Sequence, residues 1–298
     1  MKNSVWMLVA ALCLPMGCGT TTLGESKGGD PALENPALSL PTAFGSVLRR
    51  AGAEMVLAPN GISFEGQEVD GLSAGRTPDT PVTQQKFLIE PLLRTLKSRR
   101  PQKVTIAAEP STPYRVLVEA IFTLAYADVH DVQFLVKQPD GSIGAHTLAS
   151  PRRVAGPQPK YITIIVEPDR LRISRSTTDE STAADYDELP FITGPASACS
   201  AVDGWCQTDA AGACMCPDLP GLHDRVVALA ETEADYLAIA PHMEYRASGL
   251  MRIWSAIACA RPKGATASLE RFLKTAPSRA GPQTCRPLFA RVALSVAE

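Results

Sequence analysis

The sequence predicts an α+β fold of two tandem β-β-α-β-α-β modules, each a small sheet with two helices on one face. Two apolar hairpins carry this prediction: residues 55–64 alternate around a Pro-Asn-Gly turn, and residues 164–173 around a Pro-Asp turn. Proline presets φ for a turn and asparagine tolerates left-handed backbone, so both segments favour a β-hairpin. After each hairpin the same elements follow in the same order, which indicates an internal repeat.

Each hairpin is followed by a helical apolar face, a short apolar strand, a second helix opened by a Tyr-Arg pair, and a closing strand. The expected elements are residues 87–96, 104–107, 114–125 and 132–136 in the first copy, and 222–229, 237–240, 245–257 and 289–296 in the second. We expect the two copies to pair within one chain. The resulting boundaries are a signal (1–18), a flexible tether (19–50), module 1 (51–138), a linker (139–159) and module 2 (160–298) with a Cys-rich insert at about 174–220.

The N-terminus is typical of an export signal. Lys2 precedes an apolar run from Val5 to Met16, and a helix of that length rises only about 18 Å, too little to span a bilayer. The run ends in Leu14-Pro15-Met16-Gly17-Cys18, which resembles the lipobox of bacterial lipoproteins and implies Cys18 as the lipid anchor. Cleavage at an ordinary signal site and retention as an uncleaved anchor remain the alternatives.

Composition limits the partners. The chain has 29 basic and 31 acidic residues and a formal net charge of -2, so the electrostatic footprint of a nucleic-acid binder is missing. The signal predicts the periplasmic side of a bacterial cell envelope, with contact to the membrane through the lipid. Gly19 after Cys18 is not the Asp associated with inner-membrane retention, which favours the outer membrane. No motif calls for a cofactor or a resident metal.

Six cysteines follow the signal, and all lie in the second half of the chain. An exported protein with an even cysteine number predicts disulfides, with zinc binding and redox chemistry as the alternatives. Cys214 and Cys216, separated by one residue, are poorly placed to bond each other. We therefore expect Cys206 to bond one member of the Cys-Met-Cys pair and Cys199 the other, and one further bond to close the segment before the last strand. The candidates are Cys199, Cys206, Cys214, Cys216, Cys259 and Cys285.

The core of module 1 resembles the periplasmic domain of the ExbD/TolR family of biopolymer transport accessory proteins. Residues 104–109, a strand ending in Glu109, are followed by Thr112-Pro113-Tyr114-Arg115, where the family has an acidic residue and then Pro-Tyr opening the second helix. In the second copy Pro241-His242 replaces the acidic position and Glu244 precedes Tyr245. The resemblance implies a binding surface at these corners: Glu109, Tyr114, Arg115, His242, Tyr245 and Arg246.

One departure from the family decides the predicted function. The family's transmembrane helix carries an Asp used in proton translocation, whereas Val5 to Met16 is short and has no acidic residue. The sequence has no Ser-x-x-Lys motif, and we expect no enzyme. The prediction is a non-enzymatic envelope scaffold or binding protein, with peptidoglycan or envelope motor proteins as partners.

Two alternatives remain open. The chain could be an auxiliary subunit of an ExbB/ExbD-like or TolQ/TolR-like motor, or a metal-binding or enzymatic protein that uses the Cys-rich insert. Within that insert, the acidic residues Asp187 and Glu188 are expected on a solvated loop.

Overall fold

The computed structural model describes residues 39–43, 47–69, 87–138, 141–149, 161–175, 186–194, 207–208, 213–230, 236–243, 245–260, 286–289 and 291–294. The chain divides into two compact units, Met1–Asn35 and Pro36–Glu298. The described residues all belong to the second unit, so the predicted signal and most of the predicted tether lie outside them. No helix among the described residues is long and apolar enough to cross a membrane.

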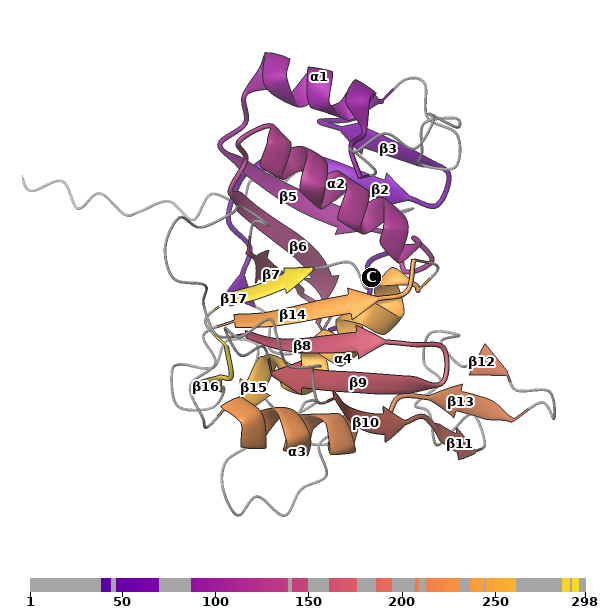
Figure 1. Cartoon of the computed structure of the whole chain (residues 1–298). Helices are drawn as coiled ribbons and strands as arrows, with labels where there is room; N and C mark the ends of the chain where they lie inside the picture. The colour runs from indigo at the N-terminus through magenta and orange to yellow at the C-terminus, as the bar shows by residue number, and fades with distance from the viewer. Residues whose placement is uncertain are drawn as a thin grey trace, which may run out of the picture. The chain divides into compact units, whose positions relative to one another are not determined.

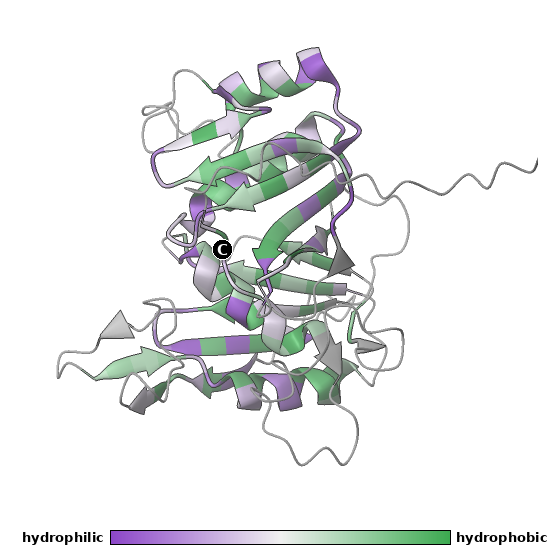
Figure 2. Cartoon of the chain, turned by 180° about the vertical axis from the view of Figure 1, so that it is seen from behind, coloured by the Kyte–Doolittle hydropathy of each residue, from purple (hydrophilic) through white to green (hydrophobic). Residues whose placement is uncertain are grey.

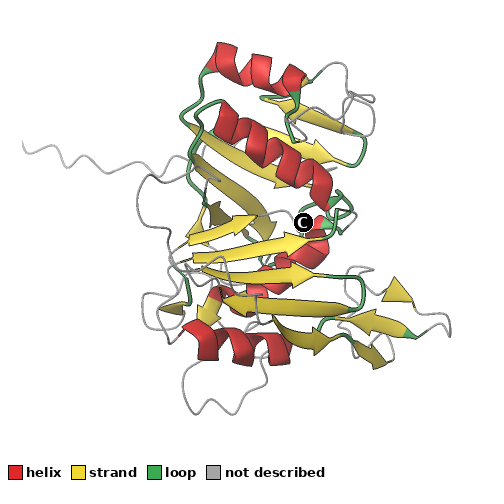
Figure 3. Cartoon of the chain, viewed as in Figure 1, coloured by secondary structure: helices red, strands yellow, loops and turns green. Residues whose placement is uncertain are grey.

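The second unit is a mixed α+β structure in which a large sheet carries four described helices (Figures 1 and 3). We call the part from β1 to β7 the N-terminal half. Its elements are β1 (Val47–Leu48), β2 (Ala53–Ala58), β3 (Gly61–Phe64), β4 (Gln67–Glu68), α1 (Glu90–Arg99), β5 (Lys103–Ala108), α2 (Tyr114–Tyr126), β6 (Asp131–Lys137) and β7 (Ile143–Leu148).

The C-terminal half runs from β8 to β17. Its elements are β8 (Tyr161–Val166), β9 (Arg170–Arg175), β10 (Tyr186–Pro190), β11 (Ile192–Gly194), β12 (Gln207–Thr208), β13 (Cys214–Cys216), α3 (Leu219–Ala230), β14 (Tyr236–Pro241), α4 (Ala247–Ala258), β15 (Cys259–Ala260), β16 (Arg286–Pro287) and β17 (Arg291–Leu294). Strands β11, β13 and β12 form a separate three-stranded sheet, and β15 pairs with β16.

One continuous twelve-stranded sheet joins the halves, instead of the two small sheets expected from the sequence. Its order is β10-β9-β8-β14-β17-β7-β6-β5-β2-β3-β4, with β1 paired to β7. Within it the orders β3-β2-β5-β6 and β9-β8-β14-β17 correspond strand by strand. In both, an antiparallel hairpin continues into parallel strands.

Local sequence explains the N-terminal half. The β2–β3 turn holds Asn60-Gly61, as expected, and the next turn has positive φ at Glu65 (49°) and Gly66 (76°), the backbone of a tight hairpin turn. Helix α1 has a proline in its first turn and ends at Arg100, whose φ of 49° lies in the left-handed region. The hairpins, helices and strands expected from the repeat are therefore present with shifted ends.

Several further strands were missed by the sequence interpretation. Strand β7 lies in the stretch interpreted as a linker, and β10 and β13 lie in the Cys-rich insert. Asp187 and Glu188 are exposed to solvent, as expected. The expectation that they occupy a loop is wrong, because both lie on β10 and pair with β9. A five-residue strand with one buried side chain, Leu189, leaves too short an alternation to detect.

The hydrophobic core lies between the sheet and the helices and continues from one half into the other. Alternate residues of β2, such as Met55 and Leu57, point toward the helices and are fully buried. Helix α1 packs on α2, α3 packs on α4, and α2 contacts α4. Figure 2 shows hydrophobic residues running along the central strands. Residues 41–43 pair with the end of β6, where Thr42 and Lys137 form a parallel bridge and the amide of Ala43 donates to the carbonyl of Lys137 (3.0 Å).

Candidate functional site

The first turns of α2 and α4 meet, and this joint contains the six residues that the sequence proposed as a binding surface. The turn before α2 follows β5, and the turn before α4 follows β14, so equivalent corners of the two halves face each other. Pro113 and Arg246 form an antiparallel bridge across the joint.

Backbone hydrogen bonds cross this joint in both directions. The amide of Arg115 donates to the carbonyl of Met243 (3.0 Å), and the amide of Ala247 donates to the carbonyl of Thr112 (2.9 Å). The amides of Tyr114 and Ser248 also donate across the joint, to Tyr245 and Pro110. First-turn amides have no partner inside their own helix and commonly bind anions. Here each helix uses them to hold the other half, so they are not free to bind a ligand.

The two tyrosines of the joint are buried rather than displayed. Tyr114 is 0% exposed and its hydroxyl donates to the carbonyl of Ile239 in β14 (3.2 Å). Tyr245 is 3% exposed and lies edge-on to the ring of His242, with 5.4 Å between ring centroids. The hydroxyl of Thr112 donates to the carbonyl of Leu57 (3.0 Å). These side chains fix the corners in place.

The remaining predicted residues form a polar rim around the joint. Arg246 is exposed, and Glu109 and His242 are half-buried. Arg115 is committed to its own helix, since its Nε lies 2.7 Å from Oε1 of Glu119. The rim therefore combines one exposed guanidinium with a half-buried carboxylate and a half-buried imidazole, residue types suited to polar recognition.

The cysteines are only partly within the described residues. Cys18, Cys199, Cys206 and Cys285 lie outside them, and of Cys259 only the backbone in β15 is described. The pairing of β15 with β16 places Ala260 opposite Arg286, so the chain neighbours of Cys259 and Cys285 lie side by side. A bond between Cys259 and Cys285 stays a prediction.

Cys214 and Cys216 are both disulfide-bonded and buried, at 3% and 2% exposure. Residues two apart in a strand have Cβ atoms about 6.7 Å apart, beyond the roughly 4 Å that a disulfide needs. Each therefore bonds a cysteine elsewhere in the chain. A bonded cysteine has no thiolate for a metal, which removes two of the four ligands that the zinc alternative required.

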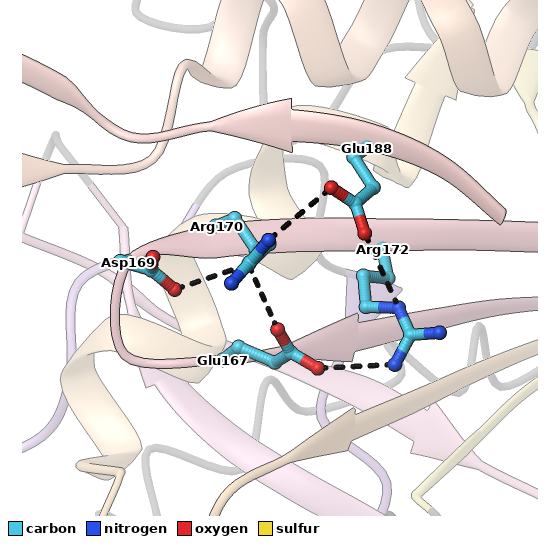
Figure 4. Close-up of polar contacts among 5 residues, drawn as sticks. All are labelled: Glu167, Asp169, Arg170, Arg172 and Glu188. Carbon is cyan, nitrogen blue, oxygen red and sulfur yellow. Dashed lines mark hydrogen bonds and ion pairs between the residues drawn. The ribbon is translucent and has the colours of Figure 1, made fainter.

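A network of ion pairs on the β8–β9 hairpin was not found from the sequence (Figure 4). Arg170 contacts Glu167 (3.0 Å), Asp169 (3.2 Å) and Glu188 (3.2 Å), and Arg172 contacts Glu167 (3.2 Å). The guanidinium of Arg172 also lies over a ring, 3.9 Å from the centroid of Tyr186. Hydrogen bonding to Glu188, helped by the charge of Asp169, raises the pKa of Arg170.

This network ties the hairpin to the neighbouring strand. Arg172 and Glu188 are register partners in β9 and β10, and opposite charges facing each other across strands stabilise a pair. The alternation Glu167-Pro-Asp-Arg170-Leu-Arg172 was the signal available in the sequence. Its partner Glu188 could not be assigned because β10 was not expected. Both guanidinium groups are engaged by carboxylates of the same network, so the cluster has a structural use and no evident substrate.

A buried histidine also lies where the two halves adjoin. His146 of β7 is 5% exposed, and its ring stacks on Trp254 of α4 with 4.7 Å between centroids and 23° between planes. Burial lowers the pKa of His146 to about 4. Its burial was not found from the sequence, because β7 was not expected and the inward alternation of that strand was therefore missed.

Among the described residues no group of three or more His, Cys, Asp or Glu could hold a metal ion. The sequence matches no family model, and no curated protein or solved structure is significantly similar to it.

Proposed function

We propose that this chain is a non-enzymatic binding or scaffold protein of the bacterial cell envelope, in which two ExbD/TolR-like modules pair within one chain. The observation that carries this proposal is the joint, where the first turns of α2 and α4 exchange backbone hydrogen bonds. The corresponding strand orders β3-β2-β5-β6 and β9-β8-β14-β17 support a duplicated unit.

In this proposal the joint replaces the interface of a homodimer. A two-fold interface brings the same surface patch together from both copies, and here both sides of the joint come from equivalent corners of one chain. Proton translocation is not part of the proposed function, because the apolar segment Val5 to Met16 has no acidic residue. A lipid on Cys18 would keep the paired modules at the membrane surface.

The oligomeric state tests the pairing. We expect the chain from Gly19 to Glu298, produced without its signal and in an oxidising compartment, to run as a monomer in size-exclusion chromatography with light scattering. Because the first-turn amides are already satisfied within one chain, dilution should leave the mass unchanged. An obligate homodimer would contradict the proposed intramolecular pair.

Binding to the cell wall tests the proposed partner. We expect the same chain to sediment with purified peptidoglycan sacculi, and Arg246→Gln to reduce the bound fraction because Arg246 is the exposed cation of the polar rim. Arg94→Gln is the matched control, since Arg94 is an exposed arginine on α1, away from the joint. Equal sedimentation of both variants, or none of the wild type, would contradict a peptidoglycan site at the rim.

A further inference from the structure

The stack of His146 on Trp254 connects the two halves through side chains. His146 belongs to β7, which pairs along its whole length with β6 of the N-terminal half. Trp254 belongs to α4 of the C-terminal half and is 3% exposed. His146 lies on the face of the sheet that carries the helices, because its register partner Phe134 is fully buried there. The contact therefore bridges β7 and α4 inside the core.

The main-chain connection beside this stack is small. Among the described residues, β7 and β17 share one register pair, Leu148 with Val292. The amide of Ala149 donates to the carbonyl of Val292 (2.7 Å). Leu148 lies two residues from His146 and on the same face of β7. We call the β7–β17 contact together with the His146–Trp254 stack the seam.

The surroundings of His146 cannot accommodate a charge. Its Nε2 is buried and has no hydrogen-bond partner among the described residues. On the neighbouring elements, the described helix-facing residues of β6 and β17 are apolar. The one charged side chain on α4 is that of Arg252. Helix α2 carries Tyr114 and Tyr126, and Glu119, which is held by Arg115. Burial, with no compensating carboxylate, is therefore the cause of the lowered pKa of His146.

We propose that His146 is an acid-sensitive latch, whose neutral ring stacks on Trp254 to hold the seam closed and whose protonation opens the β7–β17 contact. The opening is a local change about the α2–α4 joint, which keeps its backbone hydrogen bonds. A buried uncompensated cation is strongly disfavoured, whereas an imidazolium exposed to water is not. Acid therefore favours the open seam.

The sign and size of the effect follow from linkage. His146 has a pKa of about 4 when the seam is closed, against 6.5 for the exposed group. Between these two values the open form binds a proton and the closed form does not, so closure weakens as the pH falls through this window. The opening constant should rise about 30-fold by pH 5 and roughly 300-fold once both forms are protonated, at tenfold per pH unit.

Amide hydrogen exchange measured by NMR tests the latch on the chain from Gly19 to Glu298. After correction for the intrinsic pH dependence of exchange, we expect the opening constant at Ala149 to rise about 30-fold between pH 7.5 and pH 5. The amide of Ala247, which belongs to the joint, and that of Val69, which donates to Ile62 in the N-terminal half, should not follow. An equal rise at all three amides means global unfolding and overturns the proposal.

His146→Phe should abolish the rise at Ala149, because phenylalanine can keep the stack on Trp254 but cannot take a proton. His130→Gln, which changes a histidine whose side chain is 37% exposed, is the matched control and should keep the rise. An unchanged rise in His146→Phe overturns the proposal. If that variant does not fold, titration of the His146 ring by NMR replaces it. The pH midpoint of the His146 titration must match the pH midpoint of the rise in exchange at Ala149. Two different midpoints overturn the proposal.

Discussion

Tyr114 stands at the start of α2 and reaches across the joint into the C-terminal half. The Tyr-Arg pair was expected to open a helix, and Tyr114 is the first residue of α2. The resemblance that singled it out implied a binding surface, yet its ring is fully buried and its hydroxyl bonds Ile239 in the other half. A tyrosine that reaches a distant main-chain carbonyl contributes apolar contact and one hydrogen bond to the same interface.

Tyr114→Phe should therefore lower the free energy of unfolding by about 1–2 kcal/mol, because the carbonyl of Ile239 loses its donor in a buried position. Urea unfolding followed by circular dichroism measures this change. Tyr126→Phe is the control, since Tyr126 ends the same helix and is 55% exposed, and it should leave the unfolding midpoint unchanged. Equal midpoints for both variants would mean that the hydroxyl of Tyr114 does not hold the halves together.

At the scale of the element, a network of ion pairs links β8, β9 and β10. Glu188→Gln removes the carboxylate that Arg170 and Arg172 share across β9 and β10. Because Glu188 is half-exposed, the network is screened by solvent and contributes little. We expect a small fall in Tm at low salt that disappears at about 1 M NaCl, where the screening length is only about 3 Å.

A matched comparison separates this network from general surface charge. Glu90→Gln, on exposed α1, should leave Tm nearly unchanged at either salt concentration. A fall in Glu188→Gln that persists in high salt would instead indicate that packing around Arg172 and Tyr186 was disturbed.

The small sheet β11-β13-β12 depends on covalent bonds. Cys214 and Cys216 belong to the buried core cluster, although β13 has only three residues. Replacing both by alanine should cost about 2–5 kcal/mol for each bond lost, the usual range for a native disulfide in a small secreted domain. Thermal unfolding measures the cost. Peptide mapping of the wild type should find Cys214 and Cys216 bonded to Cys199 and Cys206. A bond from Cys214 or Cys216 to Cys285 would contradict the predicted pairing.

The elements that the sequence could predict are those with long or repeated patterns. Helix α2 and the β2–β3 hairpin were found because their apolar residues recur over many positions or surround a recognisable turn. Strands β7 and β10 were missed because pairing with β6 and β9 creates them, and their own sequences alternate too briefly. The sequence predicted that the residues of the site lie at the corners before α2 and α4. It did not predict that Tyr114 and Tyr245 are buried, because the opposite half of the chain covers them.

At the scale of the whole molecule, the segment before β1 is part of the folded body although the sequence placed residues 19–50 in a tether. Leu40 is 8% exposed and Ala43 is fully buried. The amide of Lys137 donates to the carbonyl of Pro41 (2.9 Å), and the amide of Arg50 donates to Oε1 of Gln133 (2.9 Å). Residues 40–43 and 47–50 therefore contact β6 and β7 of the folded body.

Truncation tests this role. A chain that starts at residue 51 should unfold at a lower Tm than one that starts at residue 36, and it should bind a hydrophobic dye. The physical reason is that the buried side chains of Leu40 and Ala43 are removed, and that Gln133 and Lys137 lose their hydrogen bonds to this segment. Thermal unfolding and dye fluorescence provide the readout. Equal Tm values would show that residues 36–50 contribute nothing to the body.

The joint between α2 and α4 has a consequence for how this protein can change over generations. In a symmetric dimer one mutation alters both sides of the interface at once, because both sides come from one gene segment. Here Thr112-Pro113 and Arg246-Ala247 are encoded separately, so each side can vary alone while the other keeps the contact. A feature that exists once, such as the His146–Trp254 stack, can arise only under that freedom.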